Sequence, residues 1–294
     1  MHNRLVDVRA LVRSKYSGWV PGFLLSALER LIHQEELNEL MQLQDYVGGV
    51  DLSNRLLRRL GISVELIGAE RLPGAGERVL FASNHPLGGA DGIVLTALLG
   101  SYFRSEAGGA VPLSVMVTDL LLQVWQMGDV FVPVNKYGAQ SRERETALRE
   151  ALEGSGQILT FPAGQVSRKE RGGEIRDSDW RPGFAKLAKR HERDILPLFF
   201  EGYNSKTFYR TEQIRMALGM KVNLGTVLLP GEFLGARGKH FKVYVGEPIS
   251  YASVPTGPEV KVFANRLRDE IYTYPERYAG EESTPFAPLL PGEE

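Results

Sequence analysis

Two side chains in one glycine-rich loop, His85 and Asp91, have the types and spacing for acid–base chemistry. The loop reads Asn84-His85-Pro86-Leu87-Gly88-Gly89-Ala90-Asp91-Gly92. Histidine has the unperturbed side-chain pKa closest to neutrality, and a carboxylate that fixes its tautomer and stabilises its charged form makes it an effective general base. Asp91 is a candidate for that carboxylate. The alternative is structural, with Asp91 as the N-cap of the next helix and His85 as a hydrogen-bonding loop residue.

The elements that flank this loop indicate where it lies in the fold. Residues 78–82 predict a short buried strand, because β-branched and aromatic residues follow the turn sequence Pro73-Gly74-Ala75-Gly76. Residues 93–99 predict the start of a buried helix that ends near Gly100. His85 would then leave a strand end at the mouth of a sheet, which is where open α/β sheets place their binding sites.

The composition excludes several classes of function. The chain of 294 residues has a net charge of −1, so we expect no bulk electrostatic attraction to nucleic acid. It contains no cysteine, which excludes disulfides and thiolate nucleophiles, and its histidines lack the spacing of metal ligands. The first residues lack the apolar core of a signal peptide, and no stretch reaches the roughly 18 apolar residues of a membrane span. We therefore expect a cytoplasmic protein, peripheral at the inner face of the cytoplasmic membrane if it acts on lipids.

Short apolar runs that alternate with helices from residue 62 onwards predict an α/β domain. We expect a mixed, mostly parallel sheet flanked by helices over residues 61–275, a helical N-terminal appendage over 1–60 and a loose C-terminal tail over 276–294. The predicted strands are 62–67, 78–82, 111–117, 130–136, 157–161, 195–200 and 242–245. If these strands run parallel, residues 162–169 reach the same sheet edge as His85.

The first helices carry an apolar stripe for which the sequence allows two partners. Phe23, Leu24 and Leu28 fall on one face at helical spacing. The stripe could pack on the rest of the domain, which is the usual fate of such a face. Alternatively, Trp19 and Phe23 could enter a lipid bilayer.

The histidine loop and the stretch before it resemble the phospholipid/glycerol acyltransferase family, typified by lysophosphatidic acid acyltransferase. The likeness begins at Val64-Glu65-Leu66-Ile67-Gly68-Ala69-Glu70-Arg71-Leu72-Pro73 and continues into Asn84-His85. The family has four residues between histidine and aspartate; here five intervene, and two of them are glycines that can absorb the insertion. This form is similar to the hemolysin-labelled branch, related to ornithine- and glycine-lipid acyltransferases. The resemblance implies a glycerol-3-phosphate acyltransferase-like fold.

A second stretch, Phe161-Pro162-Ala163-Gly164-Gln165-Val166-Ser167, resembles the family's third block, Phe-Pro-Glu-Gly-Thr-Arg-Ser, which helps to bind the acceptor. Ala163 replaces the glutamate and Val166 the arginine, two side chains that help to hold a glycerol phosphate headgroup. The basic patch that follows could receive an anionic group of the acceptor or the phosphopantetheine arm of the donor, although interleaved glutamates are also typical of a solvated loop. The substrate-binding residues implied here are Pro162, Gly164, Ser167, Arg168 and Lys169.

Residues 131–136 occupy the place of the family's second block, whose arginine binds phosphate. The candidates here are Asn135 and Lys136. A lysine binds phosphate or carboxylate as a point charge, without the bidentate fork of arginine. Alternatively, Lys136 is a solvated loop residue. With these blocks the resemblance runs in the family's order over residues 61–253.

The resemblance implies direct acyl transfer by a general base. His85 would remove a proton from an acceptor hydroxyl or amine as it attacks an acyl thioester, and Asp91 would orient and stabilise the imidazolium. Backbone N–H groups near Gly88, Gly89 or Gly164 could stabilise the oxyanion. The donor would be a thioester of acyl carrier protein or coenzyme A, with no further cofactor and no metal. The substrate-binding residues implied on this loop are Asn84, Gly88 and Gly89.

The altered second and third blocks favour a small polar acceptor, either an amino acid or aminolipid or a lysolipid. One alternative is a lysophosphatidic acid or glycerolipid O-acyltransferase with a divergent pocket. Another is a non-catalytic lipid-binding protein on the same fold. A separation of the His85 and Asp91 side chains beyond hydrogen-bond distance would favour that last alternative.

Overall fold

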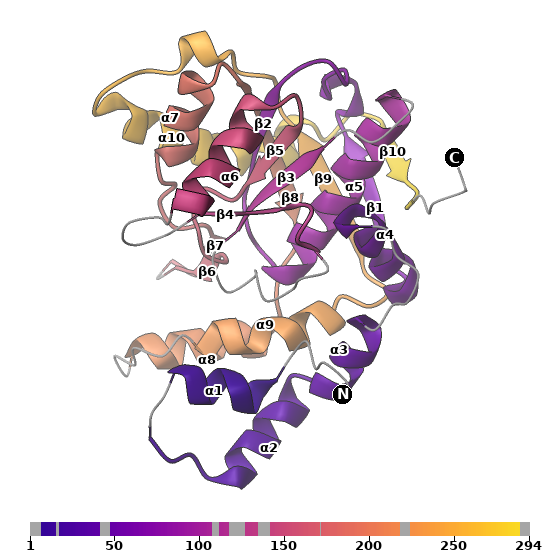
Figure 1. Cartoon of the computed structure of the whole chain (residues 1–294), viewed down its shortest axis with the longest axis vertical. Coiled ribbons are helices and arrows are strands. Elements are labelled where there is room, and N and C mark those ends of the chain that lie inside the picture. The colour runs from indigo at the N-terminus through magenta and orange to yellow at the C-terminus, as the bar shows by residue number, and fades with distance from the viewer. Residues whose placement is uncertain are drawn as a thin grey trace.

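The computed structural model describes residues 7–15, 18–41, 48–107, 112–117, 127–134, 142–170, 172–217 and 224–288. Figure 1 shows a central sheet with helices against both faces and a further group of helices below it. This layered arrangement of helices on a sheet is the predicted α/β class.

Among the described residues, eight strands form one mixed sheet. Their spatial order is β10 (Ser283–Phe286), β1 (Ser63–Ile67), β9 (His240–Val245), β8 (Asp194–Glu201), β2 (Val79–Ser83), β5 (Gln157–Thr160), β3 (Leu113–Val117) and β4 (Phe131–Pro133). The run from β8 to β4 is parallel throughout, and β1 is parallel to β9. Among these strands, β8 with β9 and β1 with β10 pair antiparallel. The predicted mixed, mostly parallel sheet is therefore confirmed.

The strand register brings the ends of β2 and β5 together. Ala82 lies opposite Thr160, and Ser83 lies opposite Leu198. Because the three strands are parallel, the segments that follow β2 and β5 leave the sheet at one edge. Residues 162–169 therefore reach the edge at which His85 lies, as the prediction required.

Helices cover both faces of the sheet (Figure 1). The helices on the faces are α4 (Gly49–Leu60), α5 (Gly89–Ala107), α6 (Arg142–Glu153), α7 (Gly183–Arg190) and α10 (Glu259–Ile271). Alternate residues of β2 point into different hydrophobic clusters, Phe81 with α4 and α5 and Leu80 with α6, α7 and α10. This is the two-sided burial that a central parallel strand requires.

Helix α5 begins earlier and ends later than predicted. We expected a stop near Gly100, but α5 continues to Ala107. Gly100 instead faces α4, since a Cβ atom at that position would lie 2.4 Å from Cγ2 of Val50. The glycine therefore permits a close approach of two helices and does not end one.

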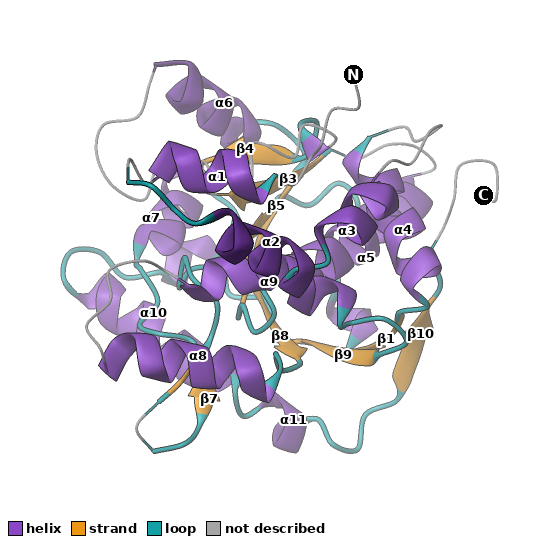
Figure 2. Ribbon diagram, turned by 90° about the horizontal axis from the view of Figure 1, so that it is seen from below, coloured by secondary structure: helices purple, strands orange, loops and turns teal. Residues whose placement is uncertain are grey.

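A group of helices lies beyond the carboxyl ends of the central strands (Figures 1 and 2). The group consists of α1 (Val8–Lys15), α2 (Gly22–Leu31), α3 (Gln34–Met41), α8 (Lys206–Ala217) and α9 (Leu224–Leu234). Helix α9 contacts the His85 loop, because a Cβ atom on Gly88 would lie 2.8 Å from Cδ2 of Leu229. Helix α9 also meets the end of α2, where a Cβ atom on Gly231 would lie 3.2 Å from the Leu31 carbonyl oxygen.

Two segments outside residues 61–275 contact the sheet or its core. Leu52, Leu56 and Leu57 of α4 are fully buried in the cluster that covers the sheet, so residues 49–60 are part of the core. In the tail, β10 pairs with β1 through Val64 and Phe286, because an edge strand offers unpaired backbone groups to any extended segment. The remaining elements are β6 (Arg168–Lys169), β7 (Ile175–Arg176), α11 (Tyr274–Arg277) and two 3₁₀ turns, Ala69–Arg71 and Tyr251–Ser253.

Candidate active site

His85 and Asp91 meet at the start of α5. His85 Nδ1 lies 3.1 Å from Oδ2 of Asp91, within hydrogen-bond distance, so the separation that would favour a non-catalytic protein is not observed. The same Oδ2 accepts the N–H groups of Leu87 at 2.8 Å and Gly88 at 3.2 Å. The five residues between His85 and Asp91, one more than in the family, still allow this contact. Gly88 has a φ of 79°, a left-handed conformation that glycine adopts without strain. Asp91 thus organises the backbone of the loop and holds the histidine with one carboxylate.

The neighbours of His85 hold its imidazole in one orientation. The ring stacks on Phe161, with centroids 4.2 Å apart and planes inclined by 29°. Burial lowers the pKa of His85, but the charge and hydrogen bond of Asp91 and the charge of Asp177 together raise it above its ordinary value, against the opposing charge of Arg168. Because Nδ1 faces Asp91, Nε2 is the nitrogen that remains for a substrate proton.

A second buried carboxylate, that of Asp177, contacts the loop and was missed by the sequence analysis. Asp177 Oδ1 accepts the backbone N–H of His85 at 3.2 Å and the hydroxyl of Ser167 at 2.6 Å. Burial raises the pKa of Asp177, and its hydrogen bonds oppose that rise. In the sequence this aspartate lies within Glu174-Ile175-Arg176-Asp177-Ser178-Asp179-Trp180, a mixed-charge stretch typical of a solvated loop. The tryptophan was the one signal that the stretch enters the core.

Asn84 lies beneath the loop. Its Nδ2 donates to the Phe200 carbonyl at 3.0 Å, and its Oδ1 accepts the Phe200 N–H at 2.7 Å. The residue is 1% exposed. The carboxamide therefore joins the end of β2 to β8 and presents almost no surface for the predicted substrate contact.

The three glycines considered for oxyanion binding differ in the use of their N–H groups. The Gly88 N–H donates to Asp91, and the Gly164 N–H donates to the Phe161 carbonyl at 2.9 Å. Gly89 is the first residue of α5, a position whose N–H has no acceptor within the helix. Gly89 is therefore the best placed of the three to donate to a substrate oxygen.

The segment after β5 packs beside His85 through buried residues. Ser167 is 1% exposed, and its N–H donates to the His85 carbonyl at 2.8 Å. Pro162 is also buried, and its carbonyl accepts the Arg181 N–H at 3.1 Å. These contacts bring the predicted residues Pro162 and Ser167 to the loop as parts of its support.

The third block departs from the family pattern at two positions, and the residues at both are buried among apolar side chains. Val166 is buried in a cluster with Phe208 and Tyr209 of α8. Ala163 is buried in the cluster that contains Trp180. Neither position therefore offers the charge that the family uses for a glycerol phosphate headgroup.

Arg168 follows Ser167 and faces α8. Its Nε lies 3.3 Å from Oε2 of Glu212, and its guanidinium lies 5.2 Å from the centroid of the Phe208 ring. Burial lowers the pKa of Arg168, and Nη1 is buried with no acceptor among the described residues. A charged donor without a partner is costly, so this guanidinium can take a further anionic oxygen. Lys169, the next residue, is exposed.

The predicted second-block residues, Asn135 and Lys136, lie outside the described residues. They follow β4, whose Pro133 pairs in parallel with Val117 of β3. The substrate contacts of Asn135 and Lys136 stay predictions.

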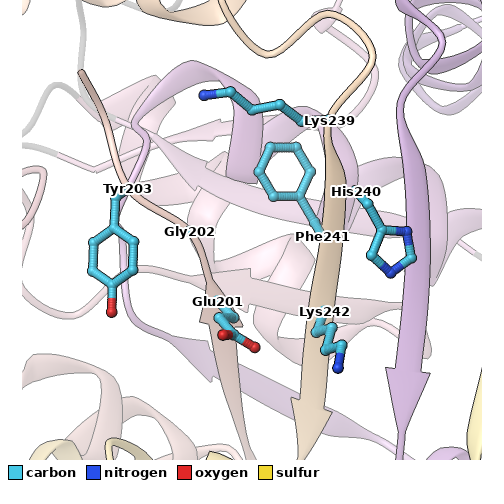
Figure 3. Close-up of a pocket in the computed structure, with 7 residues that line it drawn as sticks. All are labelled: Glu201, Gly202, Tyr203, Lys239, His240, Phe241 and Lys242. Atoms are coloured by element: carbon cyan, nitrogen blue, oxygen red, sulfur yellow. The ribbon is translucent and has the colours of Figure 1, made fainter.

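A separate pocket of about 300 Å³ lies where β8 ends and β9 begins. Figure 3 shows Tyr203 on one side of it and Phe241 on the other. It adjoins the loop, because a Cβ atom on Gly202 would lie 3.2 Å from Cδ1 of Leu87, but neither His85 nor Asp91 lines it. Within the described ranges no group of three His, Asp or Glu side chains is arranged to hold a metal ion. The lining residues are Glu201, Gly202, Tyr203, Lys239, His240, Phe241 and Lys242.

Comparisons with known proteins extend over nearly the whole chain. The protein family described as Acyltransferase matches residues 8–276. A lyso-glycine lipid O-acyltransferase of Phocaeicola vulgatus is 33% identical over 271 residues, which cover 91% of this chain and 94% of that protein. A protein of the same name from Bacteroides thetaiotaomicron is 32% identical, with 91% and 97% covered. Among solved structures, the 1-acyl-sn-glycerophosphate (LPA) acyltransferase PlsC of Thermotoga maritima aligns over 92% of this chain and 93% of its own, with 14% identity and a TM-score of 0.46.

Proposed function

This chain belongs to the acyltransferase family, and from that premise we propose that it moves a fatty acyl group from a thioester donor to the hydroxyl group of a lyso-aminolipid. Its class, an acyltransferase acting on lipid-related substrates, follows from the family and the relatives. The observation that carries the mechanism is the 3.1 Å contact of His85 Nδ1 with Asp91, because a histidine held by a carboxylate is equipped to accept a proton. The names of the relatives support an acceptor with a glycine headgroup.

The proposed reaction proceeds by direct transfer. Nε2 of His85 takes the proton of the acceptor hydroxyl while the hydroxyl oxygen attacks the thioester carbonyl carbon. The tetrahedral intermediate collapses, the C–S bond breaks, and the departing thiolate takes the proton back from the imidazolium. The products are an ester and the free thiol of acyl carrier protein or coenzyme A. Asp91 stabilises the imidazolium between the two proton transfers.

The start of α5 is the proposed site for the oxyanion. The Gly89 N–H has no acceptor within the helix, and the positive end of the helix dipole favours negative charge at this position. A donor placed where charge develops stabilises the transition state more than the ground state. Gly88 and Gly164 use their N–H groups within the protein and serve to shape the backbone.

Arg168 is the proposed partner of the acceptor carboxylate. Its Nη1 is buried and lacks an acceptor among the described residues, and its charge acts on His85. A glycine headgroup ends in a planar carboxylate, which matches the fork of a guanidinium. The apolar side chains of Ala163 and Val166 disfavour the doubly charged headgroup of lysophosphatidic acid at the same place.

The proposal is tested by offering acyl carrier protein and coenzyme A thioesters to the purified protein with lyso-glycine lipid, free glycine and lysophosphatidic acid, and detecting products by mass spectrometry. We expect an O-acylated glycine lipid as the main product. Arg168→Met should lower kcat/KM for this acceptor by about 10- to 100-fold, because a hydrogen bond to a charged group contributes about 1.5–3 kcal/mol.

The methyl ester of the lyso-glycine lipid is the matched acceptor for this test, since it lacks the negative charge. The native protein should use it poorly, and Arg168→Met should lower its rate no further. Arg190→Met, at an exposed arginine of α7, is the control variant and should act like the native protein. Preference for lysophosphatidic acid would instead favour a glycerolipid O-acyltransferase, and background signals with every acceptor would refute the proposed reaction.

The first helices are the proposed contact with a membrane surface. Leu25 of α2 and Ile32, which follows the helix, pack with Val8 of α1, whereas Trp19 and Phe23 are 85% and 73% exposed. Part of the apolar stripe therefore packs within the protein, and part of it is exposed to solvent. Because the end of α2 meets α9 and α9 lies on the His85 loop, insertion of the exposed face would bring that loop near lipid acceptors. Among the described residues no helix is both long and apolar enough to cross a bilayer.

Changing Trp19 and Phe23 together to serine should weaken binding to vesicles of phosphatidylglycerol and phosphatidylethanolamine by at least about tenfold. Full burial of one such side chain contributes about 1.5–3 kcal/mol, and about 1.4 kcal/mol is a factor of ten. Co-sedimentation measures the partition coefficient. Val262 is 61% exposed and belongs to α10, a helix that lies far from α2 in Figure 1, so Val262→Ser should leave binding unchanged. Equal binding by the double variant and the native protein would exclude this face.

A further inference from the structure

We propose that Asp177 is a positioning residue for His85, whose carboxylate holds the backbone of the histidine so that the imidazole stays between Asp91 and the Phe161 ring. The inference rests on the proposed function, because it concerns the same general base. It goes beyond the histidine and aspartate of the loop by assigning a role to a carboxylate that lies about 90 residues further along the chain.

The peptide groups on both sides of His85 Cα are held by one small network. On the amino side, the His85 N–H donates to Asp177 Oδ1 at 3.2 Å. On the carboxyl side, the His85 carbonyl accepts the Ser167 N–H at 2.8 Å, and the Ser167 hydroxyl donates to the same Oδ1 at 2.6 Å. Asp177 therefore contacts the histidine directly and through Ser167, which fixes the position from which the imidazole projects.

The other side of Asp177 is anchored in the core. Its Oδ2 accepts Nε1–H of Trp180 at 2.9 Å, and Trp180 is 1% exposed. Its backbone N–H donates to the Tyr272 hydroxyl at 2.8 Å, at the end of α10. Neither anchor can move without disturbing the cluster that covers one face of the sheet. The carboxylate is thus a fixed point that holds the His85 loop in place.

The charge of Asp177 gives it a second effect on the histidine. The charged groups that act on the imidazole are Asp91 from α5, Asp177 from the segment after β7, and Arg168 from β6, and only the last opposes protonation. Tyr272 faces Asp177 from α10. Loss of the Asp177 charge should therefore make the imidazolium less stable, which a purely structural hydrogen bond would not do.

Asp177→Asn tests the inference because it keeps the shape and one carbonyl oxygen but removes the charge. We expect kcat to fall by about 10- to 100-fold, since small displacements of a catalytic group have effects of that size, while KM for the acceptor changes by less than about threefold. The acid limb of the profile of kcat/KM against pH should move to lower pH. NMR titration of the His85 imidazole, assigned with His85→Gln among the five histidines, should show the same shift without substrate.

Trp180→Phe is the matched control, because it removes the N–H that binds Oδ2, together with part of the buried ring, and keeps the Asp177 charge. It should leave the titration of His85 in place. Ser167→Ala is the second variant if Asp177→Asn does not fold, and it should lower kcat several-fold because the link from Asp177 Oδ1 through the hydroxyl is lost. An unshifted His85 titration in folded Asp177→Asn would overturn the inference. Full kcat in Asp177→Asn or in Ser167→Ala would overturn it as well. A shifted titration in a protein that acylates no acceptor would instead retain the inference and reject the proposed function.

Discussion

Changing His85 to glutamine should lower kcat/KM for acyl transfer by about 10²–10⁴-fold, the usual contribution of a general base. Glutamine can still donate a hydrogen bond to Asp91, so the loop should keep its shape, but its amide cannot take a proton from the acceptor at neutral pH. Initial rates measured by mass spectrometry with the lyso-glycine lipid and both thioesters test this. His240→Gln, an exposed histidine of β9, is the matched control and should keep the native rate.

The pH dependence of the native protein supplies an independent check of His85. The base must be neutral to accept a proton, and Asp91 and Asp177 raise its pKa above the ordinary value of a histidine despite burial. The value of kcat/KM should therefore fall as the pH decreases, with a midpoint above the ordinary pKa of a histidine. A midpoint below that value, or a glutamine variant that keeps more than about a tenth of the native rate, would show that His85 is not the base.

Arg193→Met should destabilise the fold by about 3–5 kcal/mol, because several buried carbonyl groups lose a charged donor and each loss can cost about 1–3 kcal/mol before relaxation. Arg78 still donates to two of these carbonyls, those of Leu152 and Gly154. The side chain is fully buried. Nε donates to Leu152 at 2.9 Å, Nη1 to Gly156 at 2.7 Å and Nη2 to Gly154 at 2.6 Å, all backbone carbonyls at the end of α6 or just after it. Burial and the charge of Arg78 lower the pKa of Arg193 to about 10, so it remains charged at neutral pH.

Equilibrium unfolding in urea, followed by circular dichroism, measures this loss. Arg190→Met, three residues earlier at an exposed position of α7, should change the free energy of unfolding by less than about 0.5 kcal/mol. Arg193→Lys keeps the charge but loses the fork, so it should lie between the two and provides a folded variant if methionine is not tolerated. A loss below about 1 kcal/mol for Arg193→Met would mean that water or relaxation satisfies the carbonyls.

Several parts of the fold could be predicted because their signals are local. Buried parallel strands require apolar β-branched residues, so β2, β5 and β8 appear as short runs such as Val79-Leu80-Phe81. The stretch from Asn84 to Gly92 contains both the candidate catalytic side chains and the glycines that shape the loop. The two partners, His85 and Asp91, are only six positions apart. A contact between residues so close in the chain depends only on the conformation of the turn between them. The residue types in the turn favour that conformation.

Other features could not be predicted because their partners lie far away in the chain. Gly100 resembles a helix stop until Val50 of α4 is placed against it. Arg193 resembles any surface arginine in Lys-Arg-His-Glu-Arg-Asp, and only the end of α6 explains its burial. Asn84 was assigned to substrate binding, yet its amide matches the backbone of Phe200 across the sheet.

The sequence by itself determined the class of fold, the family, and the pairing of a histidine with an aspartate in a glycine-rich loop. These follow from hydrophobic period, turn residues and short spacing, all of which act within a few residues of one another. Only the tertiary structure decided that Phe161 stacks on His85, that Asp177 holds the His85 backbone, and that the N–H groups of Gly88 and Gly164 are already used. The physical reason is that parallel strands bring distant segments to one sheet edge, and burial there makes each hydrogen bond depend on a partner that no local pattern reveals.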